Sequence, residues 1–334
     1  MSPRPRRPTL ADVARAAGTS STVVSYVVND GPRPVSTELR RRVEEAIAAL
    51  GYRRNSLAEA LSIGRSSLVG LLVPDSSNAF FGELVRHIEH EARRRSLLTL
   101  LGNTEYDPEV ERGYERTFAD LRTAGVLLVT IDPASAADTA PRIFLHSSPP
   151  TGDEPSVVFD DEQGTRSAVE HLLAHGYDDV HCVTGPDDFG PSGLRAHSWA
   201  EAVAEAGAGG RLHRVPMDRV SSEQALRTVL RDERPRAVFA TTDEHALALL
   251  RAASQEGIRV PSELAVVGFD GIREALLGGV RVTTVAVPVP EMARIAFELL
   301  GETYSDAPVR HVRLPTTLVL GETCGCPPAP APVV

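Results

Sequence analysis

From residue 68 onward, the sequence alternates short, continuously apolar runs with longer amphipathic segments. The apolar runs have the length of β-strands, and apolar residues in the segments between them recur at helical spacing. Strands that are apolar without alternation are typical of parallel sheets covered by helices on both faces. We therefore expect an α/β body. The expected strands are Leu68–Val73, Leu97–Leu101, Val126–Thr130, Ile143–Leu145, Val157–Phe159, Val180–Thr184, Ala237–Thr241 and Leu264–Phe269, and the expected helices are Phe81–Arg95, Glu162–His175, Arg195–Ala206, Ser222–Arg231, His245–Glu256 and Glu291–Leu300.

The size of this alternating region favours two lobes over one sheet. The chain has 334 residues, and residues 66–326 belong to the α/β pattern, which is more than a single core usually contains. No glycine-rich phosphate loop follows any of the runs, since Gly185-Pro186-Asp187 and Gly190-Pro191-Ser192-Gly193 lack the required spacing. The sequence therefore disfavours an enzyme that uses a nucleotide cofactor.

Polar side chains directly follow three of the expected strands. Asp75 and Asn78 come after the first, Asp243 follows Ala237–Thr241, and Asp270 follows Phe269. Ligands of parallel α/β sheets bind outside the carboxyl ends of the strands, so we expect these side chains to meet in one cleft. Carboxylates and an amide suit hydrogen bonding to vicinal hydroxyl groups. The alternative for each aspartate is to cap the helix that follows it.

Residues 9–51 have a different pattern, with three short helical segments. The first begins at the N-cap Thr9 and ends at Gly18, a residue suited to the left-handed backbone of a helix end. A second helix is expected over Ser21–Val28, and a third between the N-cap Ser36 and Gly51. The third has its apolar positions at Val43, Ala46, Ile47 and Leu50.

The register of the first two helices favours a helix-turn-helix. Ala14, Gly18, Val24 and Val27 occupy the positions where that motif needs a small residue, a turn glycine and two core residues. A small three-helix bundle without a DNA role is the alternative, and Thr19 stands where an apolar residue is more usual.

The N-terminal region and the remainder of the chain also differ in net charge. Residues 1–65 contain 11 Arg and 6 acidic residues, a balance of +5, whereas the remainder has a balance of −15 within the net charge of −10. A basic head on an acidic body is expected where only the head meets phosphate.

Motifs throughout the chain resemble the lactose repressor (LacI) family, over residues 9–324. The body carries the most specific one, Val260–Asp270, and Asp75–Phe81 resembles the first ligand loop of the family. The other matching segments, in order, are Thr9–Ala14, Val24–Asn29, Val35-Ser36, Ala49–Tyr52, Asn55–Ala58, Thr283-Thr284-Val285 and Pro288.

The resemblance implies a head that places its second helix in the major groove of an operator. It also implies a hinge helix over residues 55–62 that folds on the operator and lies in the minor groove, where Leu61 would enter a base step. An ordinary linker helix is the alternative for this segment, and Tyr26 stands where many relatives have Arg. The residues expected to contact DNA are Thr9, Ser20, Ser21, Thr22, Ser25, Tyr26, Asn29, Asn55, Ala58 and Leu61.

For the body, the resemblance implies a two-lobed, periplasmic-binding-protein-like domain with parallel sheets that holds a small molecule between its lobes. Arg195 matches an arginine that reaches the ligand, and Phe80-Phe81 match aromatics that stack on a sugar ring. Trp199 either lines the cleft or fills the core, and Gly271 and His146 depart from the family pattern. The expected ligand-binding residues are Asp75, Asn78, Phe80, Phe81, Arg195, Trp199, Asp243 and Asp270.

The cysteines and histidines indicate neither a metal, a cofactor nor a catalytic set. Cys324 and Cys326 are two apart in a Pro-rich tail, Cys182 lies in an expected strand, and no further His or Cys is spaced to complete a metal site. The histidines at positions 171, 175 and 181 have no Ser or Cys motif near them, so no enzyme is expected.

The expected fold is an N-terminal all-α helix-turn-helix head plus an α/β body. No export signal or membrane span is evident, so a cytoplasmic protein is expected. The expected domains are a basic tail (1–8), the DNA-binding head (9–54), the hinge helix and linker (55–65), a ligand-binding and dimerisation domain (66–326) and a disordered tail (327–334); within the domain, the N-lobe covers about 66–158 and 288–315, and the C-lobe about 159–286 and 316–326.

Together these features predict a homodimeric transcriptional repressor of carbohydrate-related genes. A sugar or nucleoside-like molecule would switch its affinity for a near-palindromic double-stranded operator. The alternative is a solute-binding receptor with the same body and no DNA role.

Overall fold

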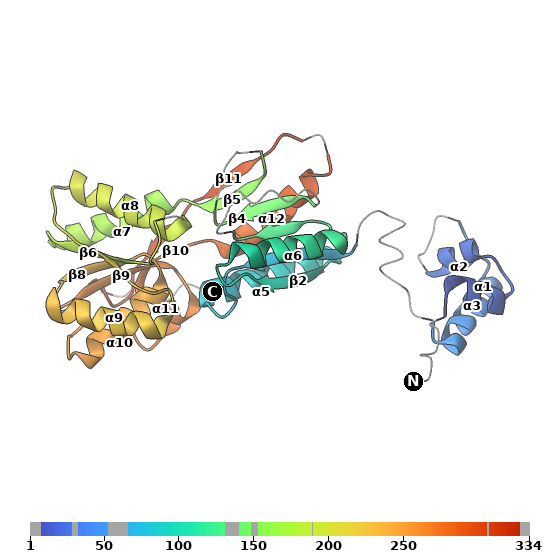
Figure 1. Cartoon of the computed structure of the whole chain (residues 1–334), viewed down its shortest axis with the longest axis horizontal. Helices are drawn as coiled ribbons and strands as arrows, with labels where there is room; N and C mark the ends of the chain where they lie inside the picture. Colours follow the sequence, from blue (N-terminus) through green and yellow to red (C-terminus); the bar gives the residue numbers. More distant parts are fainter. Residues whose placement is uncertain are drawn as a thin grey trace. The chain divides into compact units, whose positions relative to one another are not determined.

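The structure, a computed structural model, describes residues 8–28, 33–52, 66–130, 140–147, 153–188, 190–305 and 307–327. The chain divides into two compact units, Met1–Ser66 and Ser67–Val334 (Figure 1). The N-terminal unit contains α1 (Leu10–Ala17), α2 (Ser21–Val28) and α3 (Thr37–Leu50).

Each helix of the N-terminal unit begins after a hydroxyl-bearing residue, as predicted for Thr9 and Ser36. The side-chain oxygens of Thr9, Ser20 and Ser36 accept hydrogen bonds from backbone amides of the first turns. These bonds satisfy donors that have no partner within the helix. Gly18 and Gly51 end α1 and α3 in the left-handed conformation, with φ of 64° and 60°.

Small apolar side chains form the core of this unit. Ala14 lets the helices approach closely, and Arg42 of α3 donates a hydrogen bond to the carbonyl oxygen of Ala17 at the end of α1. Leu50, expected on the inward face of α3, is 38% exposed. The buried core residues are Val13, Ala14, Ala17, Val24, Val27, Val43 and Ala46.

The C-terminal unit contains two six-stranded sheets, which define two lobes. The first lobe has the strand order β11-β5-β4-β3-β1-β2, and all its neighbouring pairs are parallel. The second has the order β12-β10-β9-β8-β6-β7, and only β12 runs antiparallel to its neighbour. The strands are β1 (Leu68–Val73), β2 (Leu98–Asn103), β3 (Val126–Leu128), β4 (Arg142–Leu145), β5 (Ser156–Phe159), β6 (Val180–Thr184), β7 (Leu212–Arg214), β8 (Ala237–Ala240), β9 (Ala265–Asp270), β10 (Thr283–Ala286), β11 (His311–Leu314) and β12 (Thr317–Val319).

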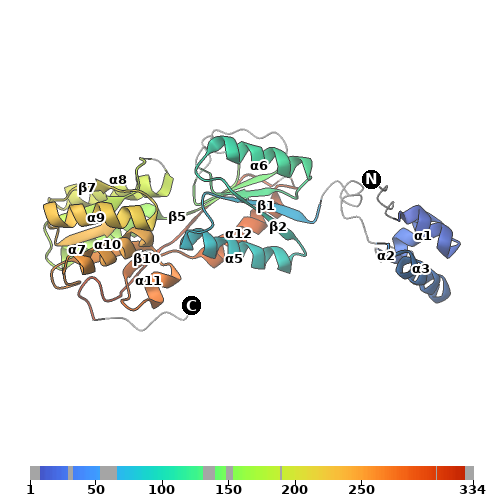
Figure 2. The same cartoon turned by 60° about the horizontal axis from the view of Figure 1, so that its bottom comes forward.

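Helices cover both faces of each sheet (Figures 1 and 2). In the first lobe α5 and α12 lie on one face and α6 on the other; in the second, α7 and α8 lie opposite α9 and α10. The helices are α5 (Ala79–Arg94), α6 (Pro108–Asp120), α7 (Asp161–Ala174), α8 (Gly190–Glu205), α9 (Arg219–Asp232), α10 (Asp243–Gln255), α11 (Arg273–Leu277) and α12 (Val289–Glu302).

The two-faced burial explains why the strands are apolar without alternation. Leu71 of β1 belongs to the core beneath α5 and α12, whereas its neighbour Leu72 packs with Phe118 of α6. In the second lobe Cys182 of β6 faces α7 and α8, and Val183 joins the core on the other face. Successive residues point to opposite sides of a strand, so both must be apolar.

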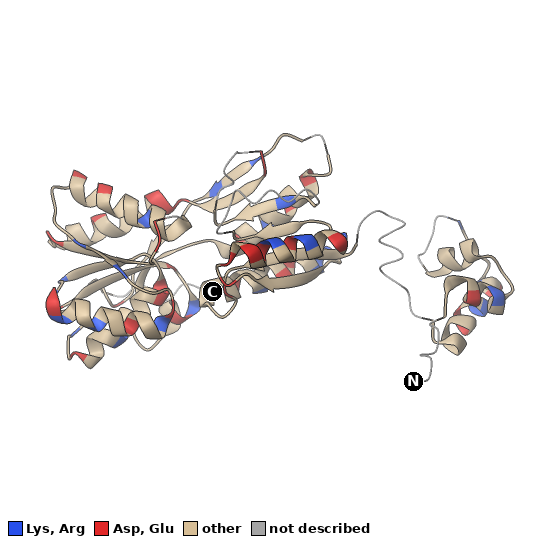
Figure 3. Ribbon diagram, viewed as in Figure 1, with Lys and Arg blue, Asp and Glu red and all other residues tan. Residues whose placement is uncertain are grey.

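The chain passes between the two lobes three times. It leaves the first sheet after β5 to enter α7, returns between β10 and α12, and leaves again between β11 and β12. Basic and acidic residues are both present along the helices (Figure 3), and on α12 Arg294 pairs with Glu291 and Glu298. None of the described helices has the length and hydropathy needed to cross a membrane.

Candidate functional site

A cavity of about 800 Å³ lies in the C-terminal unit, where strand ends of both sheets meet. The first lobe contributes residues after β1, β3, β4 and β5, and the second contributes residues after β6 and β8 and at the end of β9. This is the edge at which parallel sheets bind ligands, and the volume is within the range of small-molecule sites.

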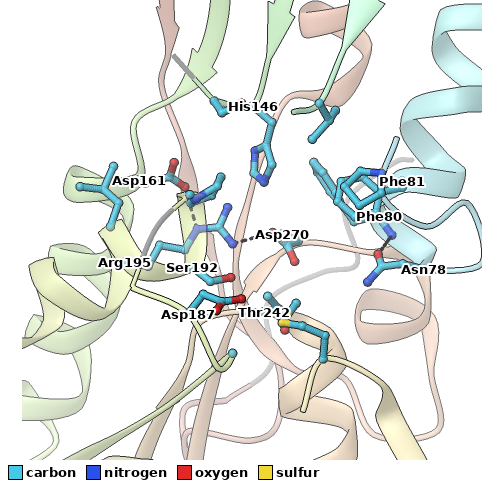
Figure 4. Close-up of a pocket in the computed structure, with 18 of the residues that line it drawn as sticks. Asn78, Phe80, Phe81, His146, Asp161, Asp187, Ser192, Arg195, Thr242 and Asp270 are labelled. Carbon is cyan, nitrogen blue, oxygen red and sulfur yellow. Dashed lines mark hydrogen bonds and ion pairs between the residues drawn. The ribbon is translucent and has the colours of Figure 1, made fainter. Parts of the chain in front are cut away.

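Arg195 of α8 is fixed at the centre of this cavity (Figure 4). Its side chain is 1% exposed; Nε donates to Asp161 Oδ1 at 2.7 Å, and Nη1 donates to Asp270 Oδ1 at 2.9 Å. Nη1 also donates to the carbonyl oxygen of Thr241, and the guanidinium lies 3.7 Å from the centre of the Phe269 ring. Nη2 has no hydrogen-bond partner among the described residues. The guanidinium is therefore held in one orientation, and its Nη2 donors remain without a partner among the described residues.

Two buried carboxyl groups flank this guanidinium. Asp161 is the first residue of α7, and Asp270 is the last residue of β9. Burial raises the pKa of Asp161 and raises that of Asp270 to about 6, although the positive charge of Arg195 opposes both shifts. The pair can accept hydrogen bonds while it fixes Arg195.

Asp243 was expected to bind ligand, but it is fully buried and is not among the residues that line the cavity. Its Oδ2 accepts hydrogen bonds from the amides of Gly271 at 2.8 Å and Ile272 at 2.9 Å, and its Oδ1 accepts one from the Thr284 hydroxyl at 2.6 Å. These bonds hold the turn in which Asp270 has a φ of 113°. Such a backbone conformation is costly for a residue with a Cβ and persists only where its surroundings impose it. Asp243 therefore positions Asp270.

An aromatic wall faces Arg195 from the first lobe. Phe80 and Phe81 lie in the first turn of α5, whose N-cap Asn78 accepts a hydrogen bond from the Phe80 amide at 3.0 Å. The Phe80 ring lies 4.8 Å from the ring of His146 and 6.3 Å from that of Phe159, measured between centroids. The wall offers an apolar surface beside the polar groups.

His146 adds one polar group to this wall. Burial, together with the positive charge of Arg195, lowers the pKa of His146 well below its usual value, so its imidazole is neutral at physiological pH. Its Nδ1 is buried and has no hydrogen-bond partner among the described residues. A ligand hydroxyl group can supply that partner.

Six of the eight residues predicted to bind ligand line the cavity: Asp75, Asn78, Phe80, Phe81, Arg195 and Asp270. Besides Asp243, the exception is Trp199, which fills the core of the second lobe and donates from Nε1 to the carbonyl oxygen of Val180 at 2.9 Å. Asp75, for which a helix cap was the alternative, lines the cavity, and its Oδ1 accepts a hydrogen bond from the Ser77 amide. The N-cap of α5 is Asn78.

Sequence reasoning missed Asp161, whose signal was present. Like the other polar residues, it follows shortly after an apolar strand, β5, and the same argument from strand ends would have found it. His146 was noted only as a departure from a pattern. Tyr106, Ser192 and Met217 also line the cavity, and their positions in loops and at a helix start have no comparable signal.

The residues predicted to contact DNA are only partly described. Ser21 and Thr22 of α2 are exposed, and Ser25 and Tyr26 are half-buried. The hydroxyl groups of Thr9 and Ser20 take part in helix caps. Asn29, Asn55, Ala58 and Leu61 lie outside the described residues.

The expectation that no histidine lies near the C-terminal cysteines is wrong. Cys324 and Cys326 meet His171 and His175 of the α7 end, and the possible ligand atoms of all four lie within 4.8 Å of one another. The spacing argument failed because the two pairs are about 150 residues apart in sequence, and only the fold brings them together.

Comparisons with known proteins match both units. Residues 9–55 match the family described as bacterial regulatory proteins, lacI family, and residues 169–324 match a periplasmic binding protein-like domain. The chain is 32% identical over 303 residues to the HTH-type transcriptional regulator DegA of Bacillus subtilis, covering 85% of this chain and 88% of that protein. It is 30% identical over 325 residues to the ribose operon repressor of Escherichia coli, covering 94% of this chain and 98% of that protein.

A solved structure matches the fold over almost the whole length. The structure of the lac repressor dimer bound to operator and the anti-inducer ONPF aligns with a TM-score of 0.84 and 25% sequence identity. The alignment covers 96% of this chain and 99% of that chain.

Proposed function

Because this chain belongs to the LacI family of bacterial regulatory proteins, we propose that it represses genes in response to a small polyhydroxylated molecule bound between its lobes. As a family member it is a DNA-binding transcriptional regulator, which acts in the cytoplasm where its operator lies. A solute receptor without a DNA role would have no use for residues 9–55.

The observation that carries the ligand class is the fixed Arg195 opposite an aromatic wall. Asp161 and Asp270 hold the guanidinium, whose free Nη2 is a donor, and both carboxyl groups retain capacity to accept. The Phe80 ring offers an apolar face to the C–H groups of a ring. Alternating donors and acceptors beside an aromatic surface suit a sugar or a nucleoside-like molecule.

We propose that DNA affinity and ligand affinity are linked through the relative position of the lobes. Two chains pair and present two heads to a near-palindromic operator. The ligand contacts both lobes, so it favours one lobe arrangement over the other, and coupling of about 1–3 kcal/mol is typical of such linkage. Residues 55–62, outside the described residues, are the proposed hinge that carries this change to the DNA.

We also propose that the chain is not an enzyme. Its relatives are named as regulators and repressors. In the described part of the cavity wall, the Ser147 hydroxyl donates to the carbonyl oxygen of Thr130, and no histidine is hydrogen-bonded to Ser147 or Ser192. A serine nucleophile needs such a base.

The test is a ligand screen coupled to DNA binding. Thermal-shift measurements on the full chain with pentoses, hexoses and nucleosides should find a compound that raises Tm. That compound should change the affinity for an operator, selected from random DNA, by about 5–150-fold in fluorescence anisotropy. A ligand that binds without changing operator affinity would contradict the linkage.

Two variants assign the effect to the cavity and to the hinge. Asp270→Asn should weaken the ligand response and preserve operator binding, whereas His197→Ala, on an exposed part of α8, should change neither. Leu61→Ala should weaken specific operator binding and leave ligand binding unchanged. Equal ligand binding by the Asp270→Asn variant would remove Asp270 from the site, and unchanged operator affinity of the Leu61→Ala variant would refute the hinge.

A further inference from the structure

Four side chains with metal-binding atoms meet in the second lobe, at the opposite end of α7 from the residue that enters the cavity. His171 and His175 come from the last turn and C-cap of α7, and Cys324 and Cys326 from the segment after β12. One ligand atom of each lies within 4.8 Å of the others. We propose that these residues form a Cys₂His₂ site for a zinc ion.

The distances within the cluster suit a tetrahedral ion. His175 Nε2 lies 3.1 Å from Cys326 Sγ, and His171 Nε2 lies 3.8 Å from the same sulfur. Zinc–sulfur bonds of about 2.3 Å and zinc–nitrogen bonds of about 2.0–2.1 Å give ligand-to-ligand separations of about 3.3–3.8 Å in a tetrahedron. The two separations to Cys326 lie close to this range, and all the ligand atoms lie within 4.8 Å of one another, so side-chain adjustments of about 1 Å would complete the tetrahedron.

Local structure brings the two histidines together on one face of α7 and the two cysteines together around one turn. His171 and His175 are four residues apart, which places them on the same face of a helix with ring centroids 4.8 Å apart. Gly325, between the two cysteines, has a φ of 96°, a conformation that favours glycine. This turn allows the thiol groups of both neighbours to face the histidines.

The cysteine segment is fixed to the sheet independently of the cluster. The Thr323 hydroxyl donates to the carbonyl oxygen of Val266 at 2.7 Å and accepts from the Thr283 amide at 2.9 Å. The Thr283 hydroxyl donates to Cys324 Sγ at 3.1 Å. Such a hydrogen bond to a ligand sulfur is the outer-shell contact that orients and stabilises metal-bound thiolates. The site is therefore largely formed before an ion binds.

The donor set selects zinc by its chemistry. Two thiolates and two neutral imidazoles form the Cys₂His₂ set of structural zinc sites, and the two negative charges neutralise the ion. Binding releases one proton from each thiol, so two protons leave for each zinc bound. Cys324 is buried, but His175 is exposed and Cys326 partly so, which leaves a route for the ion to enter.

Zinc at this position would connect the C-terminal segment to α7. The first residue of that helix, Asp161, holds Arg195 in the cavity. The ion would therefore stabilise the second lobe and the helix that positions the arginine. This inference stands on the cluster alone and does not depend on the identity of the effector.

The experiment is a metal titration of the reduced, metal-free full chain. Zinc ions added in competition with a chromophoric chelator should bind at one per chain and raise Tm. Cobalt(II) in place of zinc should give the visible absorption of a tetrahedral site together with thiolate-to-metal charge transfer. Failure to bind one zinc per chain, or a cobalt spectrum without thiolate charge transfer, would overturn the proposal.

Matched variants locate the ion. Cys326→Ser and His175→Asn alter accessible side chains, so the fold should persist, and each should weaken zinc binding at least about tenfold. Cys182→Ala, which removes a buried thiol elsewhere, and His197→Asn, which removes an exposed imidazole of α8, should bind zinc like the unaltered chain. Zinc binding that is unchanged in Cys326→Ser and His175→Asn, or equally weakened in the controls, would place the ion elsewhere and overturn the proposal.

Discussion

At the scale of single residues, the cavity depends on a buried guanidinium whose partners are themselves fixed from behind. Arg195 is bound by Asp161 and Asp270, and Asp270 is held in turn by the carboxyl group of Asp243 through the adjoining amides. Removing one partner of a buried charged group leaves the other without compensation, and this costs far more than the pair contributes. The cavity is therefore sensitive to residues that no ligand touches.

Substitution of Asp243 should show this sensitivity. Asp243→Ala should lower the free energy of unfolding by about 2–4 kcal/mol, because the buried amides of Gly271 and Ile272 lose their acceptor. Asp243→Asn keeps a carbonyl oxygen of the same shape and should cost only about 1 kcal/mol. Urea unfolding of both variants tests this, and equal stabilities would show that the carboxyl group does not hold the turn.

The raised pKa of Asp270, about 6, predicts the sign of a pH effect. Between the ordinary aspartate pKa and about 6, the folded chain retains a proton that the unfolded chain has lost. Folding stability contributed by this group is therefore complete at about pH 4 and falls as pH rises to about 6, by roughly 3 kcal/mol at most. Asp270→Asn lacks this proton equilibrium.

The measurement compares the unaltered chain with the Asp270→Asn variant in urea unfolding between pH 4 and pH 7. The difference between the two cancels the titration of the carboxyl groups that do not interact with Asp270; Asp161 and Asp243 do interact with it. As pH rises, the unaltered chain should lose stability relative to the variant, and the difference should level off above about pH 6. A difference that is constant with pH, or that moves the other way, would contradict the raised pKa.

At the scale of helices and strands, two helices of the N-terminal unit end at glycines with positive φ. Gly18 has a φ of 64°, and a Cβ there would lie 2.5 Å from Arg42 Nη2. Gly51 has a φ of 60°, and a Cβ there would meet nothing within 4 Å. The two positions share the same backbone strain and differ in steric contact.

These two glycines form a matched pair for a test. Gly51→Ala should destabilise the unit by about 1 kcal/mol through its positive φ alone. Gly18→Ala should cost more, because it also displaces the guanidinium that donates to the Ala17 carbonyl oxygen. Thermal unfolding of the two variants, followed by far-UV circular dichroism, gives the order. A larger loss for Gly51→Ala would contradict the steric role of Arg42.

Some helices and strands could be predicted from the sequence, and others could not. The bounds of the largely buried strands β1 and β6 were predicted to the residue, because short, mostly apolar runs that alternate with amphipathic segments are typical of strands in a parallel sheet. The helix α6 was missed, since its buried side includes Glu111, which accepts from Thr130, and Glu115, which accepts from Arg142, and these acids interrupt the apolar stripe. The other missed elements are β7, β10, α11, β11 and β12. Strands β7, β11 and β12 lie at sheet edges, α11 has five residues, and β10 is a four-residue interior strand that begins with two threonines.

The cavity was predictable where a residue ends a strand, and not where the contact is tertiary. Asp75 and Asp270 follow from the strand-end argument. The positions of Asp243 and Trp199 could not be assigned, since a carboxyl group behind a turn and an indole in a core have the same local sequence signals as residues lining a cleft.

At the scale of the whole molecule, the DNA-binding head and the ligand-binding body have net charges of opposite sign. The positive balance of residues 1–65 contrasts with the acidic remainder, and in the head Arg41 is already paired with Glu38 and Glu45. An acidic body does not bind nucleic acid by itself, so the attraction to phosphate is confined to one end of the chain.

Salt should therefore separate the two binding activities. Raising the salt concentration from 50 to 200 mM should weaken operator binding by about 1,000-fold, as expected for proteins with several phosphate contacts. Binding of an uncharged effector in the cavity should change little. Anisotropy titrations at several salt concentrations, with calorimetry of the effector as control, check this. A flat salt response of operator binding would refute docking dominated by phosphates.

The three passages between the lobes also have a consequence for synthesis on the ribosome. Helix α12 and strand β11, which complete the first lobe, are translated after every strand of the second sheet except β12. The first lobe is begun earliest, yet its nascent sheet must wait with the face for α12 uncovered until residues 289–314 emerge. Domains that are continuous in sequence fold one after another as they leave the ribosomal tunnel. These two lobes, in contrast, receive their last strands almost at the same time. The emerging chain therefore keeps this apolar face uncovered until residues 289–314 have left the ribosome.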